Sequence, residues 1–310
     1  MEGFYSNARS HGLWYKENMP FIMDCVGQKI NFRDFDSKKT VFFIESKHPY
    51  PLCASPDGKH YAFASGNTIT VVNTDNKESV QYKLSSKHLL DAHIMADFVS
   101  NAKIVCVYSA MRAFVPNSVI CVIDLKTGTL KAIKALKNTL ISGLCNTGKD
   151  ICLLGLYREG DVFFDGTQSL FVAHFDGVLT DKIRQIQIPD KRNEWLTLEE
   201  ICSYNPYTEE YLAINASRNS IVLLDKDFNY LKRCDIECDD MLPMMASYAG
   251  WYDNGNGIYA LTGAGIVTLD KDTLKPIDSG GGLMMVSAKC AFYDCYAACF
   301  SAAGCSIVKL

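Results

Sequence analysis

The residues best suited to acid–base chemistry are one histidine and a set of nearby acids. The segment 88–93 reads HLLDAH, and Asp97 follows His93 by four residues. A histidine close to a carboxylate can hold and transfer a proton near neutral pH. Two further acids, Glu199 and Glu200, begin an expected strand and offer one carboxylate to each face of it. These four residues are the candidate catalytic residues if the protein is a lyase or lactonase, in which a metal ion could assist.

The same residues also have a simpler interpretation. The segment 88–93 is expected to be a polar connector that bonds its own backbone, and acids on a protein surface are usually solvated. The sequence contains no Gly-x-Ser-x-Gly nucleophile elbow, phosphate-binding loop or dinucleotide-binding fingerprint. We therefore expect no cofactor, and an enzyme is the alternative hypothesis rather than the leading one.

The 13 cysteines are a high and odd number for a chain of this size. Zinc sites usually contain close Cys-x-x-Cys pairs, and no such pair occurs here. The first residues, MEGFYSNARSHG, lack the apolar core of a signal peptide. We therefore predict no metal site and a cytoplasmic protein whose reduced cysteines serve as small hydrophobic core residues.

Composition and charge exclude several classes of protein. The chain has 310 residues, of which 48% are hydrophobic and 21% charged, so we expect one folded domain over residues 1–310. Its 31 basic and 35 acidic residues give a net charge of −4, which argues against nucleic-acid binding. The longest uncharged stretch near the C-terminus, 295–308, is shorter than the roughly 18 residues of a spanning helix. We expect a monomer without a membrane segment.

An internal repeat sets the organisation of the chain. Residues 27–43, GQKINFRDFDSKKTVFF, align without a gap on residues 66–82, GNTITVVNTDNKESVQY. Each copy has an alternating strand, a polar turn and a second alternating strand, which is typical of a β-hairpin. Its first strand recurs before Asp124, Asp225 and Asp270. Such short side chains suit a turn because their oxygens accept hydrogen bonds from nearby backbone N–H groups.

A further strand precedes each hairpin, and before it come a turn and another short apolar strand. The further strands are expected at residues 61–65, 104–109, 151–156, 211–217, 258–263 and 296–301. Four short strands per repeat with tight turns indicate the blade of a β-propeller. We predict an all-β, single-domain propeller, with seven blades favoured and six as the alternative. An N-terminal strand at 3–8 should complete the C-terminal blade and close the ring.

Two motifs resemble those of a known superfamily. The segment SPDGK at 55–59, followed by YAFAS at 61–65, resembles the turn of TolB-like and WD-repeat-like propellers. The alternating strand that ends in Asp124 before KTG at 126–128 is similar to the same repeats. This resemblance implies a propeller fold. It does not select a function, because propellers serve as scaffolds, receptors, lyases and hydrolases.

Three connections are expected to be long loops on one face of the propeller, at 109–118, 156–168 and 188–198. They carry residue types that are enriched at interaction hot spots. These are Met111, Arg112, Phe114, Tyr157, Arg158, Phe163, Phe164, Arg192 and Trp195. Such residues could instead pack on one another or plug the channel. The leading hypothesis is a non-enzymatic binding or scaffold protein that presents this loop face to a protein or peptide partner.

Overall fold

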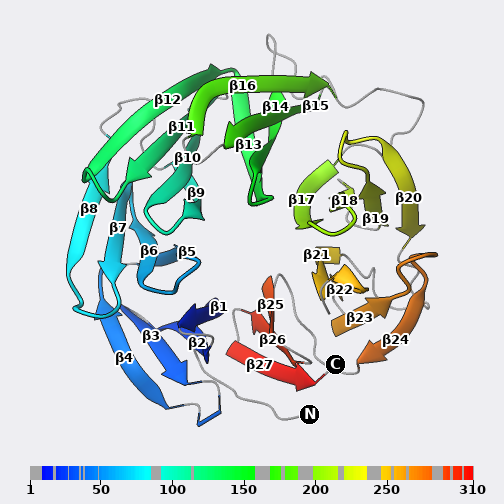
Figure 1. Ribbon diagram of the computed structural model, residues 1–310, viewed down its shortest axis with the longest axis horizontal. Helices are drawn as coiled ribbons and strands as arrows, with labels where there is room; N and C mark the ends of the chain where they lie inside the picture. Colours follow the sequence, from blue (N-terminus) through cyan, green and yellow to red (C-terminus); the bar gives the residue numbers. More distant parts are fainter. Residues whose placement is uncertain are drawn as a thin grey trace.

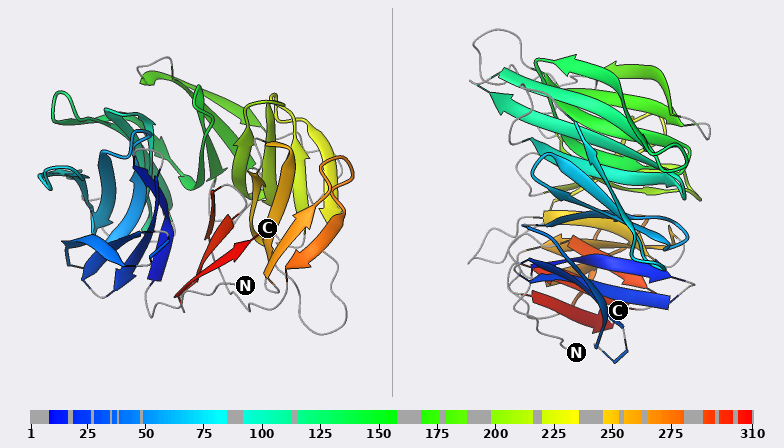
Figure 2. Two further views of the ribbon diagram at one scale, coloured as in Figure 1. Left: turned by 60° about the horizontal axis from the view of Figure 1, so that its bottom comes forward. Right: turned by 90° about the vertical axis from the view of Figure 1, so that its left-hand side faces the viewer.

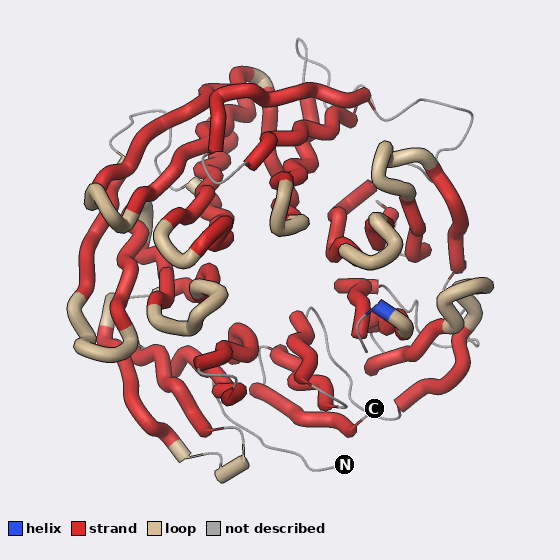
Figure 3. Tube along the Cα trace, in the orientation of Figure 1, coloured by secondary structure: helices blue, strands red, loops and turns tan. Residues whose placement is uncertain are grey.

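Antiparallel hairpins follow one another along the part of the chain that the computed structural model describes. The described residues are 9–16, 19–26, 28–34, 36–37, 39–47, 49–84, 92–112, 115–157, 168–175, 179–187, 198–215, 220–235, 246–252, 255–262, 265–280, 289–293, 296–301 and 304–309. Figure 3 shows strands joined by short turns. Within these residues, no helix has the length and apolar character needed to cross a membrane.

The described strands form sheets of four, except the last, which has three. The first sheet contains β1 (Arg9–Lys16), β2 (Met19–Val26), β3 (Lys29–Asp34) and β4 (Thr40–Glu45). The second contains β5 (Tyr50–Ala54), β6 (His60–Ser65), β7 (Thr68–Asn73) and β8 (Ser79–Lys83). The third contains β9 (His93–Ser100), β10 (Lys103–Arg112), β11 (Val115–Asp124) and β12 (Thr129–Lys137). The fourth contains β13 (Thr139–Asn146), β14 (Asp150–Tyr157), β15 (Gln168–Phe175) and β16 (Leu179–Gln187).

The remaining sheets continue the same pattern. The fifth contains β17 (Leu198–Asn205), β18 (Glu210–Asn215), β19 (Ser220–Leu224) and β20 (Tyr230–Asp235). The sixth contains β21 (Ala246–Tyr252), β22 (Gly257–Thr262), β23 (Gly265–Leu269) and β24 (Pro276–Gly280). The last contains β25 (Lys289–Tyr293), β26 (Tyr296–Ser301) and β27 (Gly304–Lys309). The predicted N-terminal strand at 3–8 lies outside the described residues.

The sheets are arranged around a common centre, with the first strand of each sheet toward the centre and the fourth at the periphery (Figure 1). Figure 2 shows from two other sides that they follow one another in chain order. The first strands of successive sheets contact each other, and β1 also contacts β25 and β26 of the last sheet. This all-β arrangement of four-stranded antiparallel sheets agrees with the predicted propeller architecture.

Among the described residues, hydrophobic cores lie between each pair of successive sheets from the first to the sixth. In β10, Cys106 and Tyr108 belong to a core shared with the second sheet. The alternate residues Val105 and Val107 belong to a core shared with the fourth sheet. All five residues from Ile104 to Tyr108 are 0% exposed. Side chains of one strand thus join two cores, as the period of two in a β-strand requires.

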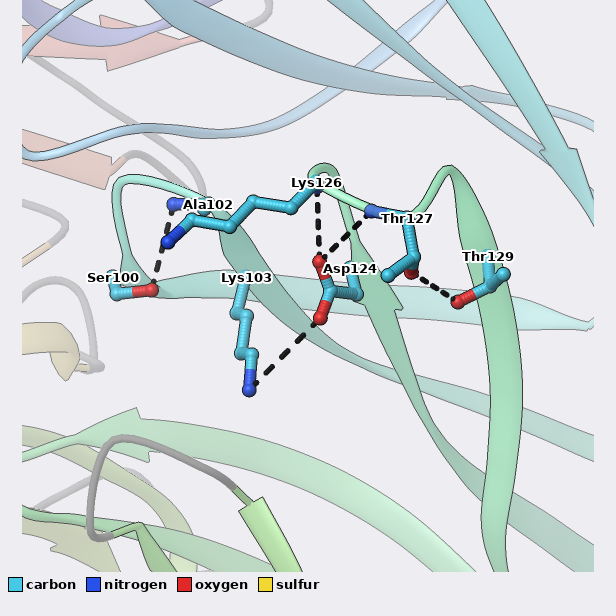
Figure 4. Close-up of polar contacts among 7 residues, drawn as sticks. All are labelled: Ser100, Ala102, Lys103, Asp124, Lys126, Thr127 and Thr129. Carbon is cyan, nitrogen blue, oxygen red and sulfur yellow. Dashed lines mark hydrogen bonds and ion pairs between the residues drawn. The ribbon is translucent and has the colours of Figure 1, made fainter.

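The turns confirm the role predicted for the acids that end the repeated strand. Asp124 Oδ1 accepts hydrogen bonds from the backbone N–H groups of Lys126 at 2.9 Å and Thr127 at 3.3 Å (Figure 4). Asp225 accepts one from Asp227 N at 2.8 Å in the same manner. The carboxylate therefore closes the turn that joins the third and fourth strands of a sheet.

The SPDGK segment forms a tight turn between β5 and β6. Ser55 Oγ donates to Asp57 Oδ1 at 2.6 Å and accepts from His60 N at 2.9 Å. Asp57 Oδ1 also accepts from Lys59 N at 3.1 Å. Gly58 has φ +68°, a backbone conformation that favours glycine. Ser55, Asp57 and Gly58 of the motif thus each have a local structural role.

One predicted loop is wrong. Residues 109–118 were expected to form a long connection, but β10 and β11 include most of them, and their pairing runs unbroken to Arg112 opposite Val115. In the structure, the hydroxyl groups of Ser109 and Ser118 bond each other inside the sheet at 2.8 Å. The ladder therefore continues past the point where the sequence suggests an end.

Candidate functional site

A buried chain of hydrogen bonds joins the third and fourth sheets at one end. Ser118 Oγ donates to the carbonyl oxygen of Thr139 at 3.0 Å and accepts from Ile141 N at 3.0 Å. Since its single proton is used in this way, Ser109 Oγ must be the donor in the 2.8 Å contact between the two serines. Ser109 and Ser118 are only 2% and 1% exposed. This link fixes the β10–β11 hairpin against β13.

Exposed apolar side chains occur at the same end of the second and third sheets. The β10–β11 hairpin extends three residues past Ser109, which pairs with the first residue of β9, His93. Near its tip, Met111 and Val115 are each 45% exposed, and they lie on opposite faces of the hairpin because Val115 pairs with Arg112, the residue after Met111. Tyr50, the first residue of β5, is 47% exposed, and its ring lies 6.5 Å from that of His93. We call Tyr50, His93, Met111 and Val115 the loop-face cluster.

The structure places only some of the predicted binding residues. Met111 and Arg112 end β10 rather than lie in a loop, and Tyr157 ends β14. Tyr157 pairs with Thr139, the residue whose carbonyl accepts the Ser118 hydroxyl. These strand ends therefore lie at the same side of neighbouring sheets. The other predicted binding residues lie outside the described part of the chain: Phe114, Arg158, Phe163, Phe164, Arg192 and Trp195.

The two candidate catalytic residues of β9 do not meet. His93 begins the strand and is exposed, whereas Asp97 lies four residues further along, about 13 Å away at the usual strand rise. Asp97 Oδ1 accepts a hydrogen bond from Phe98 N at 2.7 Å. Burial raises the pKa of Asp97 to about 6, although this bond and one with Asn146 lower it. Asp97 is thus a desolvated carboxylate set apart from His93 along the strand.

Asp97 is instead close to groups of other innermost strands. Burial raises the pKa of the Cys145 thiol well above its usual value, and the charges of Cys152, Asp97 and Glu200 raise it further. Glu200, on β17, lies beside Gly143 of β13. The Cγ atom of Glu200 would be 3.8 Å from a Cβ atom placed on Gly143. Asp97 and Glu200 thus approach β13 from its two sides.

No metal centre results from this gathering. Of Glu199 the structure describes only the backbone, in β17. Within the described ranges, no three His, Cys, Asp or Glu side chains are placed to hold a metal ion together. Sequence patterns missed the approach of Asp97 to Cys145 because it joins different sheets.

The described cysteines are free thiols, and most of them belong to the core as predicted. Cys106 lies directly opposite Cys121 in the β10–β11 pair, and Cys145 directly opposite Cys152 in the β13–β14 pair. All four side chains are buried. Burial raises the pKa of the Cys152 thiol to about 12, which keeps it protonated and unreactive at neutral pH.

Comparison with known proteins supports the fold. No protein-family model and no curated protein sequence matches the chain. Among solved structures, a chain from "Crystal Structure of Mitotic Checkpoint Complex" superposes with a TM-score of 0.69 at 10% sequence identity. The match covers 100% of this chain and 90% of that one. At this identity the likeness shows the fold alone, which is that of a β-propeller.

Proposed function

We propose that the protein is a non-enzymatic binding or scaffold propeller that presents its loop face to a protein or peptide partner. The observation that carries this proposal is the loop-face cluster, in which Tyr50, Met111 and Val115 are each about half exposed. Large apolar groups exposed at one end of neighbouring sheets are candidates for an interaction site. The similar solved chain belongs to a structure whose title names a complex, which also supports a role in assembly.

The lyase or lactonase alternative has less support. His93 and Asp97 lie at different parts of β9. The proton transfer between these two residues, which suggested the alternative, is therefore not supported by their positions. Asp97 and Glu200 do approach a common strand, but their neighbours there are Gly143 and Cys145, and the raised pKa of Cys145 keeps its thiol protonated. Purified protein assayed with and without added divalent metal against a panel of lactones tests the alternative directly.

The binding proposal is tested with two matched triple variants of the full chain. Tyr50→Ala, Met111→Ala and Val115→Ala remove the apolar groups of the loop-face cluster. Tyr207→Ala, Ile277→Ala and Val80→Ala remove comparable groups elsewhere, which are 70%, 66% and 51% exposed. A quantitative pull-down from native lysate should recover the same partner with the wild type and the control variant.

The loop-face variant should lose that partner while its thermal melt stays close to that of the wild type. A third triple variant carries Arg158→Ala, Phe163→Ala and Trp195→Ala and tests the residues that were predicted from the sequence. Equal recovery by all four proteins would refute the proposal, as would equal loss in the control variant.

For the architecture, we infer a single domain over 1–310 with seven blades, closed by the N-terminal strand at 3–8 pairing with β27. Seven described sheets and the contacts of β1 with β25, β26 and β27 support this inference. Deleting residues 1–8 would then leave β27 as an exposed edge, which promotes aggregation. We expect a lower melting temperature and lower solubility than for a chain lacking only residues 1 and 2; identical melts would contradict closure.

A further inference from the structure

A run of lysines without acids occupies the outer edge of the third sheet. Between Asp124 and Asp150 the chain contains five lysines and no Asp or Glu, although its net charge is −4. Three of these lysines, Lys131, Lys134 and Lys137, lie on β12, and all three are exposed. No other described fourth strand carries more than two cationic residues. The charge of β12 is therefore opposite to that of the protein as a whole.

The backbone of β12 also has an open edge. β12 is the outermost strand of its sheet and pairs only with β11. The outer strands β8 and β16 contact it without joining the sheet. No residue of β12 is buried, as its burial pattern shows. An edge of this kind retains N–H and C=O groups that a further strand can bond.

A bulge in the β11–β12 pair aligns two of the lysines. Lys134 pairs with Ile120 and Lys131 with Val122, because the register shifts by one residue at the bulge. Ile120 and Val122 are two residues apart and point to the same face of β11, so Lys131 and Lys134 also share a face despite their odd spacing. They lie opposite residues two apart on β11, so they are about 7 Å apart along the strand. Carboxylates of an added strand can pair with both on that face.

We propose that the outer edge of β12 is a docking surface for an acidic, extended segment of a partner protein, which adds to the sheet as a fifth strand. Main-chain hydrogen bonds supply the attraction that any strand would gain, and the lysines select for acidic residues opposite them. The same lysines repel basic strands and discourage neutral ones, which gives the edge its specificity.

The geometry favours a peptide over a nucleic acid. β12 has no aromatic residue on which a base could stack. Lysines about 7 Å apart on one face also match the spacing of alternate residues in an added strand. At one end, Lys137 pairs with Asn117, two residues from Val115 of the loop-face cluster. One partner can therefore reach both surfaces, but the β12 surface does not depend on the loop face.

The test uses a fluorescein-labelled synthetic peptide of nine residues, the length of β12, in which Glu alternates with Thr or Val. Fluorescence anisotropy with the full chain measures its affinity. We expect the triple variant Lys131→Gln, Lys134→Gln and Lys137→Gln to bind about tenfold more weakly, since each exposed ion pair contributes modestly. A peptide with Gln in place of Glu should bind the wild type as weakly as the acidic peptide binds the variant.

Two controls separate strand addition from diffuse charge. The variant Lys226→Gln, Lys271→Gln and Lys275→Gln loses the same charge from exposed turns of the fifth and sixth sheets and should bind normally. An acidic peptide N-methylated at alternate residues keeps its charge but cannot pair as a strand, so it should lose binding. Undiminished binding of the methylated peptide overturns the proposal, as does absence of acidic-peptide binding. Tighter, β12-dependent binding of duplex DNA or phosphatidylserine vesicles overturns it as well.

Discussion

Replacing Ser118 by alanine isolates the link between the third and fourth sheets. The Ser118 hydroxyl satisfies the Thr139 carbonyl and the Ile141 N–H, and it accepts the proton of Ser109. Ser118 is 1% exposed, so water has little access to replace these bonds. Each buried polar group left without a partner costs about 1 to 3 kcal/mol. We therefore expect Ser118→Ala to lower the free energy of unfolding by about 3 kcal/mol.

Urea unfolding of the wild type, Ser118→Ala, Ser109→Ala and the double variant measures this loss. Ser109→Ala should cost only about 1 kcal/mol, because Ser118 then keeps both of its backbone partners. The double variant should cost no more than Ser118→Ala alone, since the two hydroxyl groups act on one network. Equal costs for the two single variants, or additive costs in the double variant, would refute the hydrogen-bond assignment.

Three further predictions concern buried polar groups. Because burial raises the pKa of Asp97 from 3.8 to about 6, the folded protein binds this proton more tightly than the unfolded chain. Stability should therefore fall by about 2 to 3 kcal/mol as pH rises from 4 to 6, and Asp97→Asn should remove this fall in urea titrations; equal pH slopes would contradict it. The Tyr108 hydroxyl is buried without a partner in the described structure, so Tyr108→Phe should be neutral or stabilise by about 1 kcal/mol on urea unfolding. A clear loss of stability in Tyr108→Phe would instead show that the Tyr108 hydroxyl has a hydrogen-bond partner. Cys106, Cys145 and Cys152 should resist a thiol reagent in the native state, while all 13 cysteines should react after denaturation; rapid native labelling of these three argues otherwise.

Features with a local cause were predictable from the sequence. Asp124 and Asp225 close their turns as expected, because a short carboxylate bonds N–H groups within three residues of itself. The second strands were located correctly because each follows a recognisable turn and is strongly apolar. The expected strand at 104–109 lies within β10, and that at 151–156 within β14.

Features that depend on contacts between sheets were not predictable. Tyr50 and His93 are 43 residues apart in the sequence and meet only because β5 and β9 lie side by side. Asp97 and Glu200 approach β13 for the same reason. The length of the β10–β11 hairpin was also missed, because the buried bond of Ser109 to Ser118 resembles loop chemistry in the sequence.

The second strands have a consequence for how this fold tolerates substitution. Five successive residues of β10, from Ile104 to Tyr108, are fully buried, and they alternate between two different cores. An ordinary amphipathic strand has a permissive face on which polar substitutions are harmless, but this segment has none. Permissive positions are concentrated instead in the turns and in outer strands such as β12, where no residue is buried. Sequence drift should therefore be lowest in the second strands and rise toward the outer strands, which a saturation mutagenesis scan would measure.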